Sequence, residues 1–302
     1  MGSPSFGLPA LKSILDTGYT VPAVVTVPDK QKGRGQKVQF SDVKKFAVEN
    51  NLSVLQPESL KDENFILQLK SLNADLFLVI AFRILPESVF TIPKFGSVNL
   101  HASLLPKYRG AAPINHAIIN GEKVTGVTTF FLNKNVDTGN IIMQKSLDIS
   151  CEDDFGTMYA KLSYIGTGVV LDTVKAIQSG SVNLRPQSDI EASPASKIFK
   201  NDCLIMWNKP AENIHNLVRG LSPVPSAFTH LEGKALKIFK TILTSEASDS
   251  EPGVLTAVHK NLFVCTADKK LEILELQMEG KKRIPASDFV NGLSKNAVLK
   301  LV

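Results

Sequence analysis

Two patterns of apolar and polar positions follow one another along the chain. Over residues 1–150, apolar runs rich in β-branched residues alternate with stretches that repeat at the helical period. The runs predict strands at Tyr19–Pro28, Asp75–Phe82, Gly96–His101, Thr125–Leu132 and Asn140–Ile149. The helical stretches are Ser41–Asn50, where Ser41 can cap the N-terminus, and Phe155–Gln178, which Gly180 can end. This alternation is typical of an α/β fold with a Rossmann-like, mostly parallel sheet.

The pattern changes after Gly180. Residues 181–206 are polar, contain Pro186 and Pro194 and show no sustained period, so we interpret them as a linker or hairpin that leads out of the first domain. One further helix is predicted at Ala211–Arg219, with Gly220 at its end. Short alternating runs at Ala235–Leu243, Leu262–Thr266 and Leu271–Gln277 then predict a small, OB-like antiparallel β-barrel. The predicted organisation is therefore a first domain over 1–180, a linker over 181–206 and a second domain over 207–302.

Composition narrows the class of protein. A chain of 302 residues with 43% hydrophobic and 21% charged residues can bury the cores of two domains. No apolar run reaches the length of a membrane-spanning helix, and the N-terminus has neither a signal-peptide nor a transit-peptide pattern, so we expect a cytoplasmic protein. The three cysteines are scattered without metal or redox spacing, and the histidines offer no ligand spacing, so no metal is predicted. A net charge of +5 permits a polyanionic partner but does not require one.

Candidate catalytic residues lie in and after the run VNLHASLLPKYRGAAPI at residues 98–114. Asn99 and His101 alternate on a predicted strand, so both point to one face near the strand end, where open α/β sheets place their sites. Asp137 follows in the turn NVDTG. A strand histidine alone is more often structural, and Asp-x-Gly turns are common. If the turn lies beside the strand end, the amide, imidazole and carboxylate together suit acyl transfer to an external nucleophile.

Asn99, His101, the SLLP segment and Asp137 together resemble the 10-formyltetrahydrofolate-dependent formyltransferases. The resemblance implies that Asn99 and His101 hold the formyl oxygen while an amine attacks, and that Asp137 assists the histidine and the proton transfers. It implies 10-formyltetrahydrofolate as the co-substrate and formyl donor. The folate pocket would be lined by Asp137 and by two loops, namely Ser103, Leu104, Leu105 and Pro106 with Phe82, Arg83, Ile84 and Leu85.

Within that family, four separated segments resemble the members that formylate methionine on initiator tRNA. They are GSPSF at residues 2–6, PDKQKGRGQK at 28–37, RGAAPI at 109–114 and AENIHNLVRGLSPVPSAFT at 211–229. The resemblance implies that a cationic loop closes on the tRNA acceptor end and that the second domain holds the tRNA. The implied tRNA-binding residues are Lys30, Lys32, Arg34, Lys37, Lys281, Lys282 and Arg283. A surface role is the commoner one for such charge runs. We expect a bacterial enzyme of translation initiation that acts as a monomer.

Two alternatives stay open. The acceptor could be a small amine, such as an amino sugar or nucleotide, or the chain could bind tRNA or folate without useful turnover. The second alternative arises because members of the family begin with an apolar strand before the Gly-Ser/Thr-Pro turn, whereas this chain begins at Met1–Gly2. The resemblance thus implies a sheet without its first strand, which we interpret as a start at an internal Met or as a trimmed chain. Unpaired buried ladder groups on the neighbouring strands would each cost about 1–3 kcal/mol.

Overall fold

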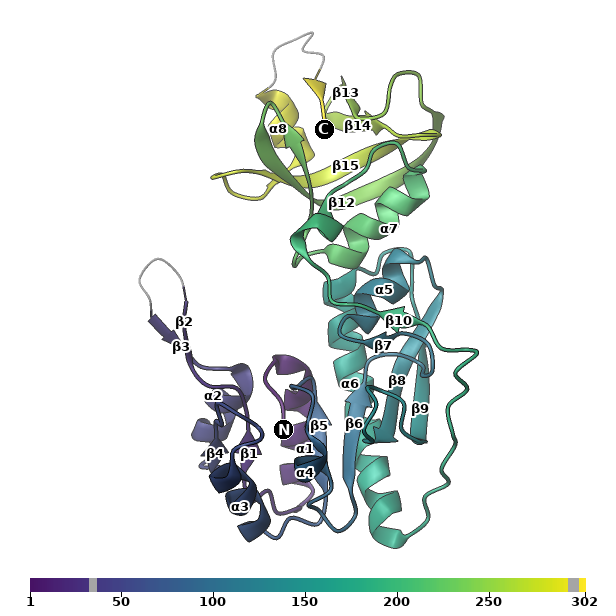
Figure 1. Cartoon of the computed structure of the whole chain (residues 1–302). Coiled ribbons are helices and arrows are strands. Elements are labelled where there is room, and N and C mark those ends of the chain that lie inside the picture. Colours follow the sequence, from purple (N-terminus) through teal and green to yellow (C-terminus); the bar gives the residue numbers. More distant parts are fainter. Residues whose placement is uncertain (33–36, 293–298) are drawn as a thin grey trace. The chain divides into compact units, whose positions relative to one another are not determined.

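The computed structural model describes residues 1–32, 37–292 and 299–302, and it divides into two compact units (Figure 1). The first unit comprises Met1–Pro113, Thr125–Leu147 and Tyr159–Ala195, and the second comprises Ile114–Val124, Asp148–Met158 and Ser196–Val302. Two short segments that interrupt the first unit in sequence thus belong to the second unit, a division that the apolar pattern did not predict.

The main sheet of the first unit has the strand order β5-β6-β8-β9. Its strands are β5 (Phe77–Ile80), β6 (Ser97–His101), β8 (Val124–Phe131) and β9 (Ile141–Asp148), each within a predicted run or one residue from it. Strands β5 and β6 are parallel, whereas β8 is antiparallel to β6. Helix α6 (Phe155–Ser179) covers the sheet, because Ile177 packs with Val98 and Ile142 in one apolar cluster. As predicted, the chain leaves α6 at Gly180, whose φ of 70° suits glycine.

The predicted strand at Tyr19–Pro28 is reduced to β1 (Val24–Val25), which pairs in parallel with β4 (Val54–Leu55). Met1 and Gly2 bridge this pair to β5 through backbone hydrogen bonds, and Val25 packs with Phe77 and Val79 in one apolar cluster. The Gly2 amide donates to the Val25 carbonyl at 3.0 Å, and the Ile80 amide donates to the Met1 carbonyl at 2.9 Å. Within the described residues, no strand therefore lies between β1 and β5, which agrees with the predicted sheet without its first strand.

The remaining elements of the first unit are short. Helix α2 begins after Ser41, whose hydroxyl accepts a hydrogen bond from the Lys44 amide, which confirms the predicted cap. Helices α1 and α3 carry amphipathic patterns that the sequence analysis did not assign. The bounds are η1 Ser5–Gly7, α1 Leu8–Asp16, β2 Lys30–Lys32, β3 Lys37–Gln39, α2 Asp42–Glu49, α3 Glu63–Ser71, α4 Glu87–Phe90, β7 Arg109–Gly110 and β10 Pro194–Ala195, whereas α5 (Pro113–Ile119) belongs to the second unit from Ile114 onward.

Residues 181–195, predicted as part of a linker, pair along the first unit. Arg185 exchanges backbone hydrogen bonds with Ile141 at 2.8 and 3.0 Å. Further along, β10 runs parallel to β7, so that Pro194 lies opposite Arg109 and Ala195 opposite Gly110. We refer to residues 185–195 as the strap. Because its bonds are formed with residues tens of positions away, a period in the local sequence could not reveal them.

The second unit is built around an antiparallel sheet with the order β11-β12-β15-β14-β13-β17. Its two ends meet, because His230 of β11 and Val302 exchange backbone hydrogen bonds at 2.8 and 3.0 Å. The predicted barrel is thereby confirmed as a nearly closed one. The bounds are η2 Lys200–Cys203, α7 Ala211–Leu221, β11 Ala227–Leu231, β12 Lys234–Ala247, β13 Val254–Val258, β14 Asn261–Cys265, β15 Lys269–Met278, β16 Ile284–Pro285, α8 Ala286–Asn291 and β17 Leu299–Lys300.

Helix α7 packs on this barrel through Ile214, Val218 and Leu221, which belong to one core with Leu236 and Leu271. The prediction that Gly220 ends this helix is wrong, since α7 continues to Leu221.

The lack of a side chain at Gly220 serves packing instead. A Cβ at this position would lie 2.6 Å from the Ile119 side chain, and the Asn115 amide donates to the Gly220 carbonyl at 2.8 Å. Close approach of two helices, and not a turn, therefore requires glycine at this position.

Candidate functional site

His101 ends strand β6 and is 7% exposed. Its Nε2 lies 2.8 Å from the backbone carbonyl oxygen of Tyr108. A carbonyl oxygen only accepts, so Nε2 carries a proton and Nδ1 is the nitrogen that can gain or lose one. Nδ1 faces the Asp137 carboxylate, with 3.8 Å between Nδ1 and Oδ2. The structure therefore brings together the histidine and the aspartate that the sequence analysis selected.

Asn99 lies two residues before His101 on β6, so both side chains leave the same face of the strand. Asn99 is half-buried, and within the described residues its side-chain amide makes no hydrogen bond. An amide at this depth without a protein partner is available to a ligand. Asn99 and His101 thus lie at the end of one strand, and Asp137 approaches them from a turn.

The turn at residues 137–139 holds Asp137 in an unusual backbone conformation. Asp137 has a φ of 54°, in the left-handed region that aspartate tolerates better than most residues. Its Oδ2 also accepts a hydrogen bond from the Gly110 amide at 2.9 Å. Gly139 passes so close to the end of the preceding strand, β8, that a Cβ there would lie 1.6 Å from the Phe131 carbonyl oxygen. The position of the Asp137 carboxylate is therefore fixed by the turn and by the Gly110 amide of β7.

The SLLP loop is anchored from inside the protein. The Ser103 hydroxyl is fully buried and donates to the Lys107 carbonyl at 2.7 Å. Leu105 is 3% exposed, and its amide donates to the Thr128 hydroxyl at 3.1 Å. The side chains of Ser103 and Leu105 thus hold the loop, whereas Leu104 and Pro106 are half-buried. A ligand beside this loop would meet Leu104, Pro106 and the backbone.

The second predicted ligand loop, Phe82–Leu85, starts beside strand β6. Ile80 pairs with Leu100 in parallel register, so the chain leaves β5 next to His101. The Arg83 guanidinium donates to the carbonyls of Pro57 and Glu58 at 2.7 and 3.0 Å, which ties the loop down. Along this loop Leu85 is buried, and Phe82 is half-buried, whereas Ile84 is 76% exposed. The backbone of this loop is thus the part that lies at the carboxyl edge of the sheet.

The first predicted RNA-contacting segment forms a hairpin of β2 and β3, in which Lys30 lies opposite Gln39 and Lys32 opposite Lys37. Arg34 lies outside the described residues. Lys30 is exposed. The hairpin stands at the edge of the first unit in Figure 1.

The second predicted segment, Lys281–Arg283, follows β15 as an exposed turn. Its three cations differ in their surroundings. Arg283 forms an ion pair with Glu275 and lies 4.3 Å from the Phe239 ring centroid. Lys281 and Lys282 form no ion pair with the described residues. The two lysines are therefore the free positive charges of this turn.

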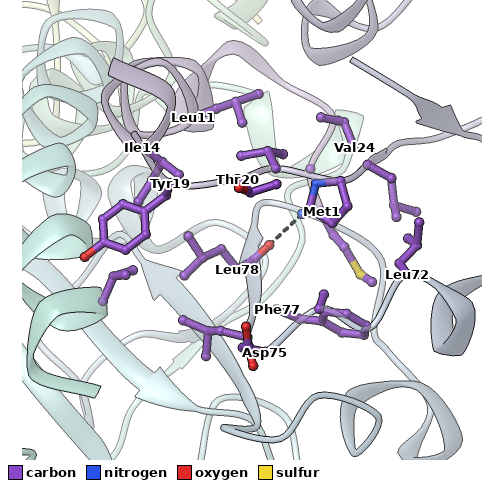
Figure 2. A pocket seen from close by; sticks show the side chains of 18 of the residues that line it. Met1, Leu11, Ile14, Tyr19, Thr20, Val24, Leu72, Asp75, Phe77 and Leu78 are labelled. Atoms are coloured by element: carbon purple, nitrogen blue, oxygen red, sulfur yellow. Dashed lines mark hydrogen bonds between the residues drawn. The ribbon is translucent and has the colours of Figure 1, made fainter. Parts of the chain in front are cut away.

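A large apolar cavity lies elsewhere in the first unit, and Figure 2 shows its lining. It measures about 550 Å³ and is lined by residues of α1, β1 and β5, among them Ile14, Val24 and Phe77. The Met1 amine donates to the Leu78 carbonyl at its edge, and burial lowers the pKa of that amine to about 5. Asn99, His101 and Asp137 do not line the cavity. The cavity thus lies between β1 and β5, and the candidate catalytic residues have no part in it.

Metal-binding groups and membrane-spanning helices are both absent from the described residues. Within residues 1–32, 37–292 and 299–302, no group of three or more His, Cys, Asp or Glu side chains could hold a metal ion. Across the same residues, no helix combines the length and the apolar character that crossing a membrane requires.

Two groups that the sequence did not single out lie beside the candidate catalytic residues. The Tyr108 carbonyl orients His101, and the Gln187 side chain contacts the 137–139 turn. The first is a backbone atom and the second lies in a stretch without periodicity, so neither had a signal in the residue pattern.

Comparisons with known proteins agree with this geometry. The family model described as "Formyl transferase" matches residues 2–174, and that described as "Formyl transferase, C-terminal domain" matches residues 197–294. A protein named methionyl-tRNA formyltransferase from Bacteroides fragilis is 44% identical over 100% of this chain and 96% of its own length. One of the same name from Parabacteroides distasonis is 46% identical, with 98% and 95% covered.

Solved structures share the fold at lower identity. A sugar 3N-formyl transferase, crystallised in the presence of dTDP and 5-N-formyl-THF, superimposes with a TM-score of 0.67 at 23% identity, over 93% of this chain and 97% of that one. An N-formyltransferase from Helicobacter canadensis, in complex with folinic acid and dTDP-3-aminofucose, gives 0.67 at 22% identity over 92% and 97%.

Proposed function

The chain belongs to the formyl transferase family, and we propose that it transfers the formyl group of 10-formyltetrahydrofolate to the α-amino group of methionyl initiator tRNA. The observation that carries the proposal is the approach of Asp137 to His101 within 3.8 Å, beside the unpaired amide of Asn99. Full-length relatives named for this reaction support the choice of acceptor. Cytoplasmic location in a bacterium and a monomeric state complete the proposal.

Asn99 and His101 act on the formyl oxygen. As the amine nitrogen forms its bond to the formyl carbon, negative charge builds on that oxygen. The Asn99 amide and a protonated His101 Nδ1 donate hydrogen bonds to it, which lowers the barrier. The Tyr108 carbonyl occupies Nε2, so Nδ1 is the nitrogen left for this task. Asp137 stabilises the charged form of His101 and accepts or relays the proton that the attacking amine loses.

The atoms balance without a further reactant. A new bond joins the amine nitrogen to the formyl carbon, and the bond from that carbon to N10 of the folate breaks. The proton lost by the amine ends on N10, so the products are the N-formyl amine and tetrahydrofolate. The amide, imidazole and carboxylate of this site fit a donor whose reacting group is a carbonyl, since they supply oxyanion donors and a proton acceptor.

The proposal assigns the folate to the edge formed by two loops and by Asp137. The loops are Ser103, Leu104, Leu105 and Pro106 with Phe82, Arg83, Ile84 and Leu85. Ser103 and Leu105 face inward, so their contribution is the shape of the loop. Ile84, which is 76% exposed, and the half-buried Leu104 offer apolar contact to an aromatic ligand.

Cationic side chains on both units hold the tRNA in this proposal. Lys30, Lys32, Arg34 and Lys37 act at the acceptor end, and Lys281, Lys282 and Arg283 act on the barrel. Contacts of this kind give affinity and salt dependence and no sequence choice. In this proposal the predicted first domain, over 1–180, does the chemistry, residues 181–206 lead to the second domain, and residues 207–302 bind the RNA.

A second candidate keeps the chemistry and changes the acceptor to a small amine. It is favoured by the shared fold with a sugar 3N-formyl transferase and with an N-formyltransferase crystallised with an aminosugar nucleotide.

An acceptor assay separates the candidates. Purified protein is incubated with 10-formyltetrahydrofolate and either methionyl initiator tRNA or a panel of amino sugars and amino nucleotides, and formylated products are measured by mass spectrometry. Formylation of the tRNA supports the proposal. Formylation of small amines alone supports the second candidate, and binding without product supports a protein that no longer turns over.

A further inference from the structure

Gln187 of the strap contacts the turn at residues 137–139, although the sequence pattern assigned this part of the chain to a linker. Nε2 of Gln187 donates to the carbonyl oxygens of Asp137 at 3.0 Å and Gly139 at 2.8 Å. Gln187 is half-buried, whereas its neighbours Pro186 and Ser188 are exposed. One amide group thus spans the two carbonyls that flank Thr138.

Arg109 fixes the orientation of that amide. The Arg109 Nε donates to the Gln187 Oε1 at 3.0 Å. A reversed amide would place Oε1 against two carbonyl oxygens and its NH₂ group against a guanidinium, so only one orientation is favourable. Arg109 is itself held, because its Nη1 donates to Asp189 at 2.8 Å. Gln187 therefore meets the turn as a prearranged donor.

These contacts close a ring around Asp137. The carboxylate of Asp137 is bound by the amide of Gly110. The main chain of Asp137 is bound by Gln187, which Arg109 holds in turn. Arg109 and Gly110 are consecutive residues of β7, so the side chain and the main chain of Asp137 are attached to the same two-residue strand. The preceding residue, Tyr108, supplies the carbonyl that binds His101.

We infer that Gln187 is a positioning residue for formyl transfer: its amide holds the 137–139 turn so that the Asp137 carboxylate faces His101. The backbone of the turn needs such support, because Asp137 is in the left-handed region with a φ of 54°. Without the two donors, both carbonyls lose their protein partner and the turn can relax. A displacement of about 1 Å at a reacting group can cost on the order of 100-fold in rate. Gln187 touches neither substrate in this account.

Two substitutions test the inference. Gln187→Met keeps the length and volume of the side chain and removes both donors. Gln187→Glu keeps the acceptor for Arg109 and sets a carboxylate against the two carbonyls. Asn50→Ala is the matched control, since the Asn50 amide donates to the Phe46 carbonyl at 2.8 Å at the end of α2, remote in sequence from the catalytic loops. All three are compared with the wild type in full-length protein.

The inference rests on the proposed function, and kinetics are its first measurement. Gln187→Met is expected to lower kcat by at least ~10-fold and to change the KM for tRNA and for 10-formyltetrahydrofolate by less than ~3-fold, with Gln187→Glu at least as slow. Asn50→Ala is expected to stay within ~2-fold in kcat. A kcat within ~2-fold of the wild type in Gln187→Met overturns the inference, as does a loss no larger than the loss of folded protein.

Amide hydrogen exchange is the second measurement and needs no turnover. Exchange at Gly110 reports its bond to the Asp137 carboxylate, whereas exchange at Arg109 reports its backbone bond to Ser193 at 2.9 Å. Gln187→Met is expected to speed exchange at Gly110 by ~10-fold or more and to leave Arg109 within ~3-fold. Equal changes at both amides, or none, would overturn the positioning role. If the wild type forms no formyl product, the proposed function fails, and the exchange result still decides the role of Gln187.

Discussion

The catalytic loops and the barrel core are held by different forces. Around Asp137, the contacts are directional hydrogen bonds between segments far apart in the sequence, such as Gly110 to Asp137 and Gln187 to Gly139. In the second unit, fully buried side chains such as Leu236 and Leu271 pack into one apolar core. Hydrogen bonds fix direction at a modest net free energy, whereas burial contributes stability with little direction. Substitutions should therefore change rate in the first region and stability in the second.

The largest effect is expected at Asp137. Asp137→Ala should lower kcat by ~10²-fold or more, because it removes the carboxylate that faces His101 and that takes the proton of the amine in the proposed reaction. Asp137→Asn keeps an acceptor for the Gly110 amide and removes the charge, so it should be nearly as slow. Steady-state formylation of methionyl-tRNA measures both, and the Kd for tRNA should change by less than ~3-fold. Full activity of Asp137→Asn would show that position alone, and not charge, is required.

In the barrel, Leu236→Ala should lower the free energy of unfolding by about 2–4 kcal/mol, as expected for a buried leucine whose loss leaves a cavity. Leu243→Ala on the same strand is the control, because Leu243 is 43% exposed and should cost less than about 1 kcal/mol. Denaturant unfolding followed by the fluorescence of Trp207, the single tryptophan, reports on this unit directly. Equal losses in the two variants would contradict the packing account.

A smaller effect is expected at the exposed lysines of the barrel turn. Replacing Lys281 and Lys282 together by Gln should weaken tRNA binding and reduce the slope of log K against log salt by about 1–2, because each phosphate contact contributes about 0.7–0.9. Arg283→Gln should change the slope less, since Glu275 already neutralises that guanidinium. Replacing exposed Lys61 and Lys175 by Gln is the control. An unchanged slope in the double variant would show that this turn does not contact the RNA.

The smallest effect concerns pH. Burial, with a further contribution from Arg219, lowers the pKa of His215 to about 4. The His215 imidazole of the unfolded chain binds a proton near pH 6.5, whereas that of the folded chain does so only near pH 4. The free energy of unfolding therefore decreases as pH falls from about 6.5 to 4. His215→Gln should reduce this loss by about 1 kcal/mol, allowing for partial exposure. Thermal unfolding from pH 7 to 4 measures it, with the exposed His259→Gln as control. Identical pH curves for His215→Gln and the wild type would contradict the assignment.

The same contrast explains what the sequence could predict. Strands β5, β6 and the barrel strands β12, β14 and β15 were predicted because burial imposes a period on neighbouring residues. Asn99 and His101 were found by the same alternation, and Asp137 by its turn and by resemblance. The Tyr108 carbonyl, the Gln187 amide and the pairing of the strap with β7 depend on contacts between distant segments, which leave no local period. The end of helix α7 was predicted wrongly at Gly220 for a related reason, because a glycine required by packing and a glycine that ends a helix look alike in sequence.

Single-turnover formylation with excess enzyme tests both the proposed acceptor and the proposed role of His101. Methionyl initiator tRNA is mixed with 10-formyltetrahydrofolate and either the wild type or His101→Ala, and formylmethionyl-tRNA is followed in time. The account predicts product from the wild type and a rate at least ~10²-fold lower for His101→Ala at unchanged tRNA affinity. Equal rates in the two proteins, or no formylated tRNA from the wild type, would contradict it.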